Sequence, residues 1–126
     1  MINIVKQIEY WQGSAESNIE TAGILVASGK YIEGMFFCHL SIEKILKAIV
    51  VKQIENVPPR SHDLFHLAGI ADIEISETQS DFMQILMKYQ LEGRYPEYYP
   101  KAPSREKINE YLYHTKNLLE CFSKML

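Results

Sequence analysis

The segment from residue 31 to about residue 54 places the tightest constraint on how this chain can fold. Its apolar residues recur at steps of three and four, and they occupy most faces of a helix. They include Met35, Phe36, Phe37, Cys38, Leu40, Ile42, Ile45, Leu46, Ile49 and Val50. A helix that is apolar on most faces needs neighbours on most faces, so this segment predicts a buried central helix.

Two other long segments have helical periodicity. Residues 4–27 carry one apolar stripe, and Gly29 is expected to end this helix because glycine tolerates the left-handed terminal conformation. Ser104 is expected to cap a last helix, whose stripe runs over residues 108–126. These helices are long enough to cover the central one.

Two shorter helices are expected between the long ones. Ser61 can cap a helix at roughly residues 62–71, and residues 76–79 form a capping-box pattern that opens another helix ending near Gly93. Alternating strand patterns are absent. We therefore predict one all-α domain over residues 1–126, an antiparallel up-and-down four-helix bundle with one additional short helix.

The bulk properties narrow the classes of function. A chain of 126 residues fits one domain, and no apolar run approaches the ~20 residues that span a bilayer. The first residues lack an export signal, which predicts a cytoplasmic protein without membrane contact. The formal charge of −3 argues against coating nucleic acid by bulk electrostatics, although it leaves room for a local basic site. Cys38 and Cys121 are expected to be free, buried thiols.

The first candidate site lies on the central helix. His39, Glu43 and Lys47 are spaced i, i+4 and i+8, so they stack along one side. One interpretation is a polar cleft in which Glu43 or His39 meets a ligand. The other is a row of ion pairs within the helix, or side chains that extend their charges to a subunit interface.

The second candidate is the histidine pair His62 and His66. Two histidines at i and i+4 can share a metal ion, but Asp63 stands where a zinc protease has glutamate, and no third ligand is evident. We therefore predict no metal site here, and we assign Asp63 to the first turn of a helix. Glycine-rich phosphate loops and other cofactor motifs are also absent, so no cofactor is expected.

The third candidate is the segment from residue 94 to residue 105. Six of the eight tyrosines fall between Tyr89 and Tyr113, and Arg94, Lys101 and Arg105 are interleaved with them. Aromatic rings and guanidinium groups are suited to stack a base and to hold a phosphate. The alternative is a loop that its three prolines stiffen and that tyrosine packing holds against the bundle.

Taken in order, these segments resemble the HEPN family, small helical domains named for nucleotide binding in higher eukaryotes and prokaryotes. The matching residues are Trp11, Ala15, residues 29–31, Phe37, residues 41–48, residues 58–59, residues 61–64, Tyr89 and residues 93–96. The resemblance covers essentially the whole chain. It implies a four- or five-helix bundle that forms a homodimer and acts beside a minimal nucleotidyltransferase, in pairs similar to toxin–antitoxin systems.

Some members of that family are metal-independent ribonucleases with an arginine followed four to six residues later by a histidine. This chain departs from that pattern. Tyrosines occupy the corresponding positions after Arg94, and Arg105 has no histidine before His114. Arg60 precedes His66 by six residues, but this pair straddles the expected third helix.

We therefore interpret the chain as a HEPN-like nucleotide- or RNA-binding module that acts as a homodimer with a nucleotidyltransferase. The predicted contact residues are Glu43, Lys47, His62, Asp63, Arg94 and Tyr95. Arg94 would pair with phosphate, Tyr95 would stack, and Glu43 with Lys47 would form the polar cleft. One alternative is a metal-independent ribonuclease that uses Arg94 and a base from His39 or His62. Another is a structural partner subunit without a ligand.

Overall fold

The computed structural model describes residues 2–126, and every regular element within that range is a helix. The elements are α1 (Ile4–Ala27), α2 (Tyr31–Ile54), α3 (Leu64–Ile70), α4 (Glu77–Met87), the short 3₁₀ turn η1 (Pro96–Tyr98) and α5 (Arg105–Ser123). The prediction of an all-α chain is confirmed, and the first two helices have the predicted bounds.

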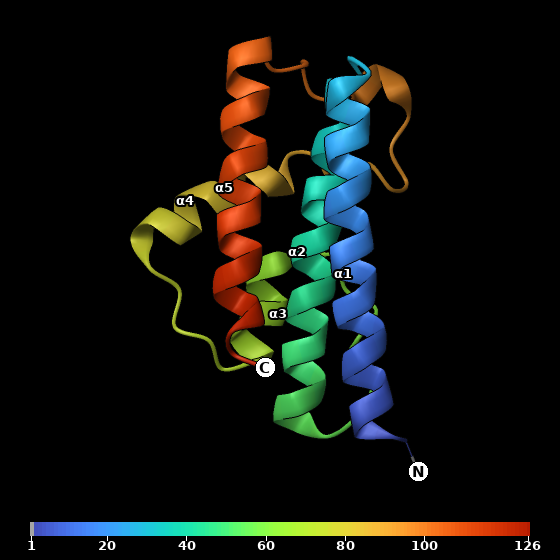
Figure 1. Cartoon of the computed structure of the whole chain (residues 1–126), viewed down its shortest axis with the longest axis vertical. Coiled ribbons are helices and arrows are strands. Elements are labelled where there is room, and N and C mark those ends of the chain that lie inside the picture. The colour runs from blue at the N-terminus through green and yellow to red at the C-terminus, as the bar shows by residue number, and fades with distance from the viewer. Residues whose placement is uncertain (1) are drawn as a thin grey trace.

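The three long helices lie along one another (Figure 1). α1 and α2 are antiparallel, and α5 runs in the same direction as α2. The chain returns between α2 and α5 through α3, α4 and the loop that follows, and α4 lies obliquely to the long helices. A regular up-and-down arrangement of four helices is therefore not confirmed.

Local signals explain most helix ends. The predicted capping box at the start of α4 is confirmed, because Ser76 Oγ accepts from Gln79 N at 3.1 Å while Gln79 Oε1 accepts from Ser76 N at 3.0 Å. Ser104 caps α5 as predicted, with its hydroxyl accepting from Lys107 N at 3.1 Å. Gly29 has a φ of +81° and follows α1.

Two helix boundaries near the site differ from the prediction. α3 begins at Leu64, later than expected, and its N-cap is Asp63, whose Oδ1 accepts from Phe65 N at 2.9 Å. Ser61 is not the cap of α3; its hydroxyl accepts a hydrogen bond from the backbone N–H of Asp63 at 3.1 Å, in the turn that precedes the helix. α4 ends at Met87, before Gly93, and the backbone N–H groups of residues 88–90 bond to carbonyls three residues earlier, as in turns. After Arg94, the chain forms no α-helix before α5, only the short 3₁₀ turn η1 with Pro96 at its first position.

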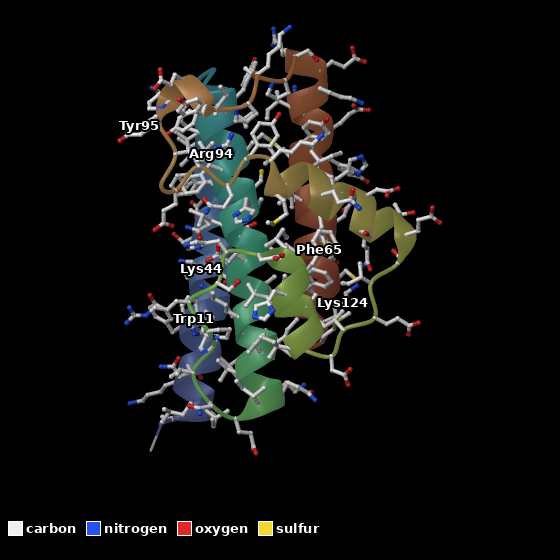
Figure 2. All side chains as sticks on the ribbon, turned by 180° about the vertical axis from the view of Figure 1, so that it is seen from behind. Trp11, Lys44, Phe65, Arg94, Tyr95 and Lys124 are labelled. Atoms are coloured by element: carbon white, nitrogen blue, oxygen red, sulfur yellow. The ribbon has the colours of Figure 1, made fainter. Side chains whose placement is uncertain are left out.

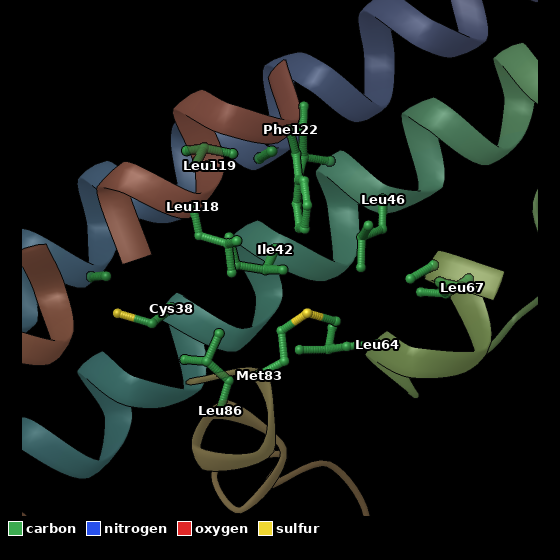
Figure 3. Packing of buried hydrophobic residues seen from close by; sticks show 14 of the residues in the cluster. Cys38, Ile42, Leu46, Leu64, Leu67, Met83, Leu86, Leu118, Leu119 and Phe122 are labelled. Atoms are coloured by element: carbon green, nitrogen blue, oxygen red, sulfur yellow. The ribbon is translucent and has the colours of Figure 1, made fainter. Parts of the chain in front are cut away.

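The hydrophobic core surrounds α2, where 14 of the 24 residues are buried, so the prediction of a central helix is confirmed. Figure 3 shows side chains of α2, α3, α4 and α5 meeting in this core, among them Ile42, Leu64, Met83 and Phe122. Deleting such side chains leaves cavities that cost about 2–5 kcal/mol each. Within residues 2–126, no helix combines the length and apolar character needed to cross a membrane.

One glycine of α2 lies close to α1. A Cβ atom on Gly34 would lie 2.8 Å from Val26 Cγ2, so a side chain there would force Val26 or the two helices to shift. The absence of a side chain at Gly34 thus allows α1 and α2 to pack closely at this point.

Candidate functional site

A cluster of five ionisable side chains joins α2 to two loops. We call it the Glu43 cluster, and its members are His39, Glu43, Lys47, His62 and Glu92. The first three come from α2, His62 precedes α3, and Glu92 follows α4. The structure therefore brings together Glu43, Lys47 and His62, three of the six predicted contact residues.

Glu43 is the centre of this cluster, and its side chain is only 2% exposed. Its Oε2 accepts from Lys47 Nζ at 3.0 Å, and its Oε1 accepts from His62 Nδ1 at 2.9 Å. A buried carboxylate is costly unless charges and hydrogen bonds compensate it. Here each carboxylate oxygen has a donor with which it can form a charge-assisted hydrogen bond.

His62 lies between two carboxylates. Its Nδ1 faces the buried Glu43, and its Nε2 lies 3.1 Å from Oε2 of Glu92. An ionised carboxylate only accepts hydrogen bonds, so Glu43 accepts from Nδ1, and the ring forms an ion pair with Glu92 when both of its nitrogens carry a proton. The His62 side chain is 39% exposed, which makes this imidazole the part of the cluster nearest to solvent apart from Glu92.

His39 holds the backbone before α3 in place. Its Nε2 lies 3.0 Å from the carbonyl oxygen of His62, and since a carbonyl only accepts, Nε2 carries the proton. Burial lowers the pKa of His39 below its ordinary value, against the opposing effect of Glu43. The other nitrogen, Nδ1, is buried 3.8 Å from Glu43 Oε1 and has no hydrogen-bond partner among residues 2–126.

Two ammonium groups lie beside the indole of Trp11. Lys47 Nζ is 5.2 Å from the ring centroid and Lys44 Nζ is 5.6 Å from it, both within cation–π range. Lys44 also donates to Ser14 Oγ at 3.1 Å. Within residues 2–126, Lys47 has a carboxylate partner and Lys44 forms no ion pair. Lys44 therefore lies at the edge of the Glu43 cluster, and no carboxylate of residues 2–126 compensates its positive charge.

The loop of residues 94–103, which we call the tyrosine loop, continues directly from Glu92 and Gly93. Figure 2 shows Trp11, Lys44, Arg94 and Tyr95 following one another along one edge of the molecule. The guanidinium of Arg94 donates to the carbonyls of Lys88 at 3.0 Å, Gln90 at 3.3 Å and Tyr98. Arg94 thus shapes the loop, and its contact with phosphate stays a prediction.

The remaining predicted contact residues differ in their placement. Tyr95 is 71% exposed, with its ring centroid 6.5 Å from that of Tyr98, so a base has access to it. Asp63 points its carboxylate at the first N–H groups of α3, with Oδ1 accepting from Phe65 and His66. Asp63 therefore acts as a helix cap. Among residues 2–126, no three histidine, cysteine or acidic side chains form a cluster that could hold a metal ion.

A separate groove of about 420 Å³ lies between α4 and α5. Its walls are mainly apolar and include Phe82, Ile85, Tyr111 and Leu118. The lysine at this groove, Lys107, already pairs with Glu110 at 3.2 Å. The groove has the size of a small-molecule site, but none of the residues described along its walls is a buried ionisable side chain comparable to Glu43.

Sequence reasoning missed two members of this region. Glu92 reaches His62 across 30 residues of sequence, and no periodic pattern relates two loop residues at that distance. Lys44 lies outside the i, i+4, i+8 row of His39, Glu43 and Lys47, although its three-residue step from Lys47 places both lysines on one side of α2. The i, i+4 spacing of Glu43 and Lys47 did signal their contact.

Comparison with known proteins agrees with this fold. The model of the HEPN domain family matches residues 8–126. The chain is similar in structure to the crystal structure of TT1696 from Thermus thermophilus, with a TM-score of 0.79 and 21% sequence identity over 95% of this chain and 98% of that one. No curated protein is significantly similar in sequence. The match to the family model spans nearly the whole chain, and the chain therefore belongs to the HEPN domain family.

Proposed function

We propose that this chain is a nucleotide- or RNA-binding module, and that the edge formed by the Glu43 cluster and Lys44 contacts phosphate. The observation that carries the proposal is the ordered set of donors around the buried Glu43. It holds the imidazole of His62 toward solvent and places Lys47 beside Lys44. Imidazole and ammonium groups are suitable donors for phosphate oxygens.

The tyrosine loop supplies the second half of the proposed site. Tyr95 is exposed and follows Arg94, which holds the loop by hydrogen bonds to three carbonyls. Base stacking on an aromatic ring is worth about 1–3 kcal/mol. We assign Tyr95 the stacking role, and Arg94 keeps two N–H groups beyond those that bind the loop.

The experiment uses Trp11, the only tryptophan, as an internal probe. Fluorescence titration with 5′-AMP and with a short single-stranded RNA should show saturable binding. Lys44→Ala should weaken it by about one to two decades, because a charge-assisted hydrogen bond is lost. Lys107→Ala, a matched control with the same change in net charge, should bind as the wild type does. Equal losses in both variants, or no binding by calorimetry, would refute the site.

A second candidate function is metal-independent RNA cleavage, and the Glu43–His62 pair is the observation that favours it. A buried carboxylate that holds Nδ1 of a histidine leaves Nε2 outward, which is how acid–base histidines are oriented. His62 would take the proton of a 2′-hydroxyl as its oxygen bonds to phosphorus. The bond from phosphorus to the 5′ oxygen then breaks, and that oxygen leaves as a hydroxyl with a proton from water. Cleavage in chelator that His62→Asn abolishes would establish this activity; intact RNA after prolonged incubation would exclude it.

We also propose that the chain acts in the cytoplasm as a homodimer, beside a nucleotidyltransferase in a pair similar to a toxin–antitoxin system. Membership of the HEPN family supports this assignment. Light scattering at micromolar concentration should give twice the monomer mass of 14.6 kDa. A monomer would contradict the dimer.

A further inference from the structure

Glu92 is the one carboxylate of the Glu43 cluster that faces solvent. Its side chain is 62% exposed, whereas that of Glu43 is 2% exposed. Both carboxylates contact His62, but on opposite nitrogens: Glu43 holds Nδ1 from inside the fold, and Glu92 covers Nε2 from outside. The two contacts therefore have different consequences for a ligand that approaches from solvent.

The backbone around Glu92 is held in a defined turn. Leu91 is buried, Glu92 N donates to Gln90 Oε1 at 2.6 Å, and Arg94 N donates to Leu91 O at 3.0 Å. Gly93 has a φ of +80°, a conformation that other residues rarely adopt. The carboxylate of Glu92 can consequently leave His62 by side-chain rotation alone, while this turn stays in place.

The contact between Glu92 and His62 is weak enough to exchange. An ion pair of exposed groups contributes little to stability, because water solvates both partners after separation. A carboxylate oxygen and a phosphate oxygen make the same kind of charge-assisted hydrogen bond to a ring N–H. A phosphate that reaches His62 from solvent meets Nε2, and this is where Glu92 lies.

We propose that Glu92 is an internal competitor that occupies the position of a ligand phosphate on His62. It shields the imidazole in the free protein, and it turns into solvent when the phosphate of a nucleotide or RNA binds. This inference rests on the proposed phosphate-binding function. It predicts that removing a charged residue from the site strengthens binding, which is the opposite of the effect expected for Lys44.

The test compares Glu92→Gln with Glu97→Gln. Both changes remove one negative charge from the same stretch of loop, and both residues are exposed, but Glu97 forms no ion pair with any of residues 2–126. Calorimetric titration with 5′-AMP should show that Glu92→Gln binds about two- to fivefold more tightly than the wild type. Glu97→Gln should leave the affinity unchanged. Adenosine, which lacks the phosphate, should bind all three proteins alike.

The outcomes separate this inference from the proposed function. Tightening that is specific to Glu92→Gln and to 5′-AMP supports the competitor. If the wild type binds 5′-AMP and Glu92→Gln binds equally well or more weakly, the competitor is refuted while the binding function stands. Equal tightening in both variants also refutes it, because bulk charge is then the cause. If neither the wild type nor Glu92→Gln binds 5′-AMP, the proposed function itself fails, and this inference fails with it.

Discussion

The Glu43 cluster and the tyrosine loop differ in burial and in the partners of their polar side chains, although the sequence predicts both as candidate sites. In the cluster, a carboxylate that is 2% exposed is held by donors from α2 and from the segment before α3. In the loop, Tyr95 is 71% exposed and Arg94 donates to backbone carbonyls of neighbouring residues. The cluster connects segments that are far apart in the sequence, whereas the loop is held by hydrogen bonds between residues that are close in the sequence.

This difference separates the buried side chains, which should set stability, from the exposed ones, which should set recognition. Changes at the buried members of the cluster, Glu43, Lys47 and His39, should alter the free energy of unfolding, because they leave buried polar groups without partners. Changes at the exposed tip of the loop should leave that free energy nearly constant and act on ligand affinity. The following predictions test this division, beginning with the largest expected effect.

Glu43→Leu should destabilise the fold by about 3–5 kcal/mol, because it leaves Lys47 buried without a counter-charge. The double variant Glu43→Leu with Lys47→Met should be more stable than the single one, since both buried charges are then removed. Urea unfolding followed by circular dichroism measures both. Glu110→Ala, which breaks the exposed pair with Lys107, is the control and should cost under about 1 kcal/mol. Equal losses for Glu43→Leu and Glu110→Ala would contradict the assigned role of the cluster.

The burial of His39 should make stability depend on pH. Its pKa is lowered in the folded chain, so as pH falls below about 6.5 the unfolded chain takes up a proton at this position before the folded chain does. The free energy of unfolding should therefore fall toward acid, by up to about 1.4 kcal/mol per pH unit from this group. Urea unfolding at pH 7.5, 6.5 and 5.5 should show a steeper decline for the wild type than for His39→Gln. Parallel curves would show that His39 does not carry this effect.

Tyr95→Ala should give the smallest change in stability, within about 0.5 kcal/mol, because most of the ring is already in water. The same variant should lose about 1–3 kcal/mol of binding free energy for 5′-AMP if a base stacks on the ring. Tyr95→Phe keeps the aromatic face and should bind nearly as the wild type does. A lower melting temperature without loss of affinity would instead place Tyr95 in the packing of the loop.

The long helices could be predicted from the sequence because their apolar residues repeat with the period of the helix that they form. The bounds of α1 and α2 follow from that repeat and from Gly29. The start of α3 could not be predicted in this way. His62 contacts α2 through both its ring and its carbonyl, and Asp63 caps the helix after it, so α3 begins only at Leu64.

The contacts of the candidate site likewise include some that sequence spacing predicts and others that depend on the fold. The i, i+4 spacing of Glu43 and Lys47 encodes their contact locally, so the sequence was sufficient. The position of Glu92 depends on the turn between Leu91 and Arg94 and on where α4 ends. Asp63 and Arg94 were recognised as polar residues of interest, but their partners are backbone groups that only the folded loop brings within reach.

The most direct test of the phosphate-binding edge is to follow the histidine rings during titration with 5′-AMP. His62 lies in the Glu43 cluster, and His114 lies in the groove between α4 and α5, so the two rings report on the two rival sites of one molecule. Two-dimensional ¹H–¹⁵N spectra of the ring nitrogens should show a saturable shift of His62 Nε2, with His114 unchanged. A shift of His114 with a constant His62 would contradict this account and place the ligand in the groove.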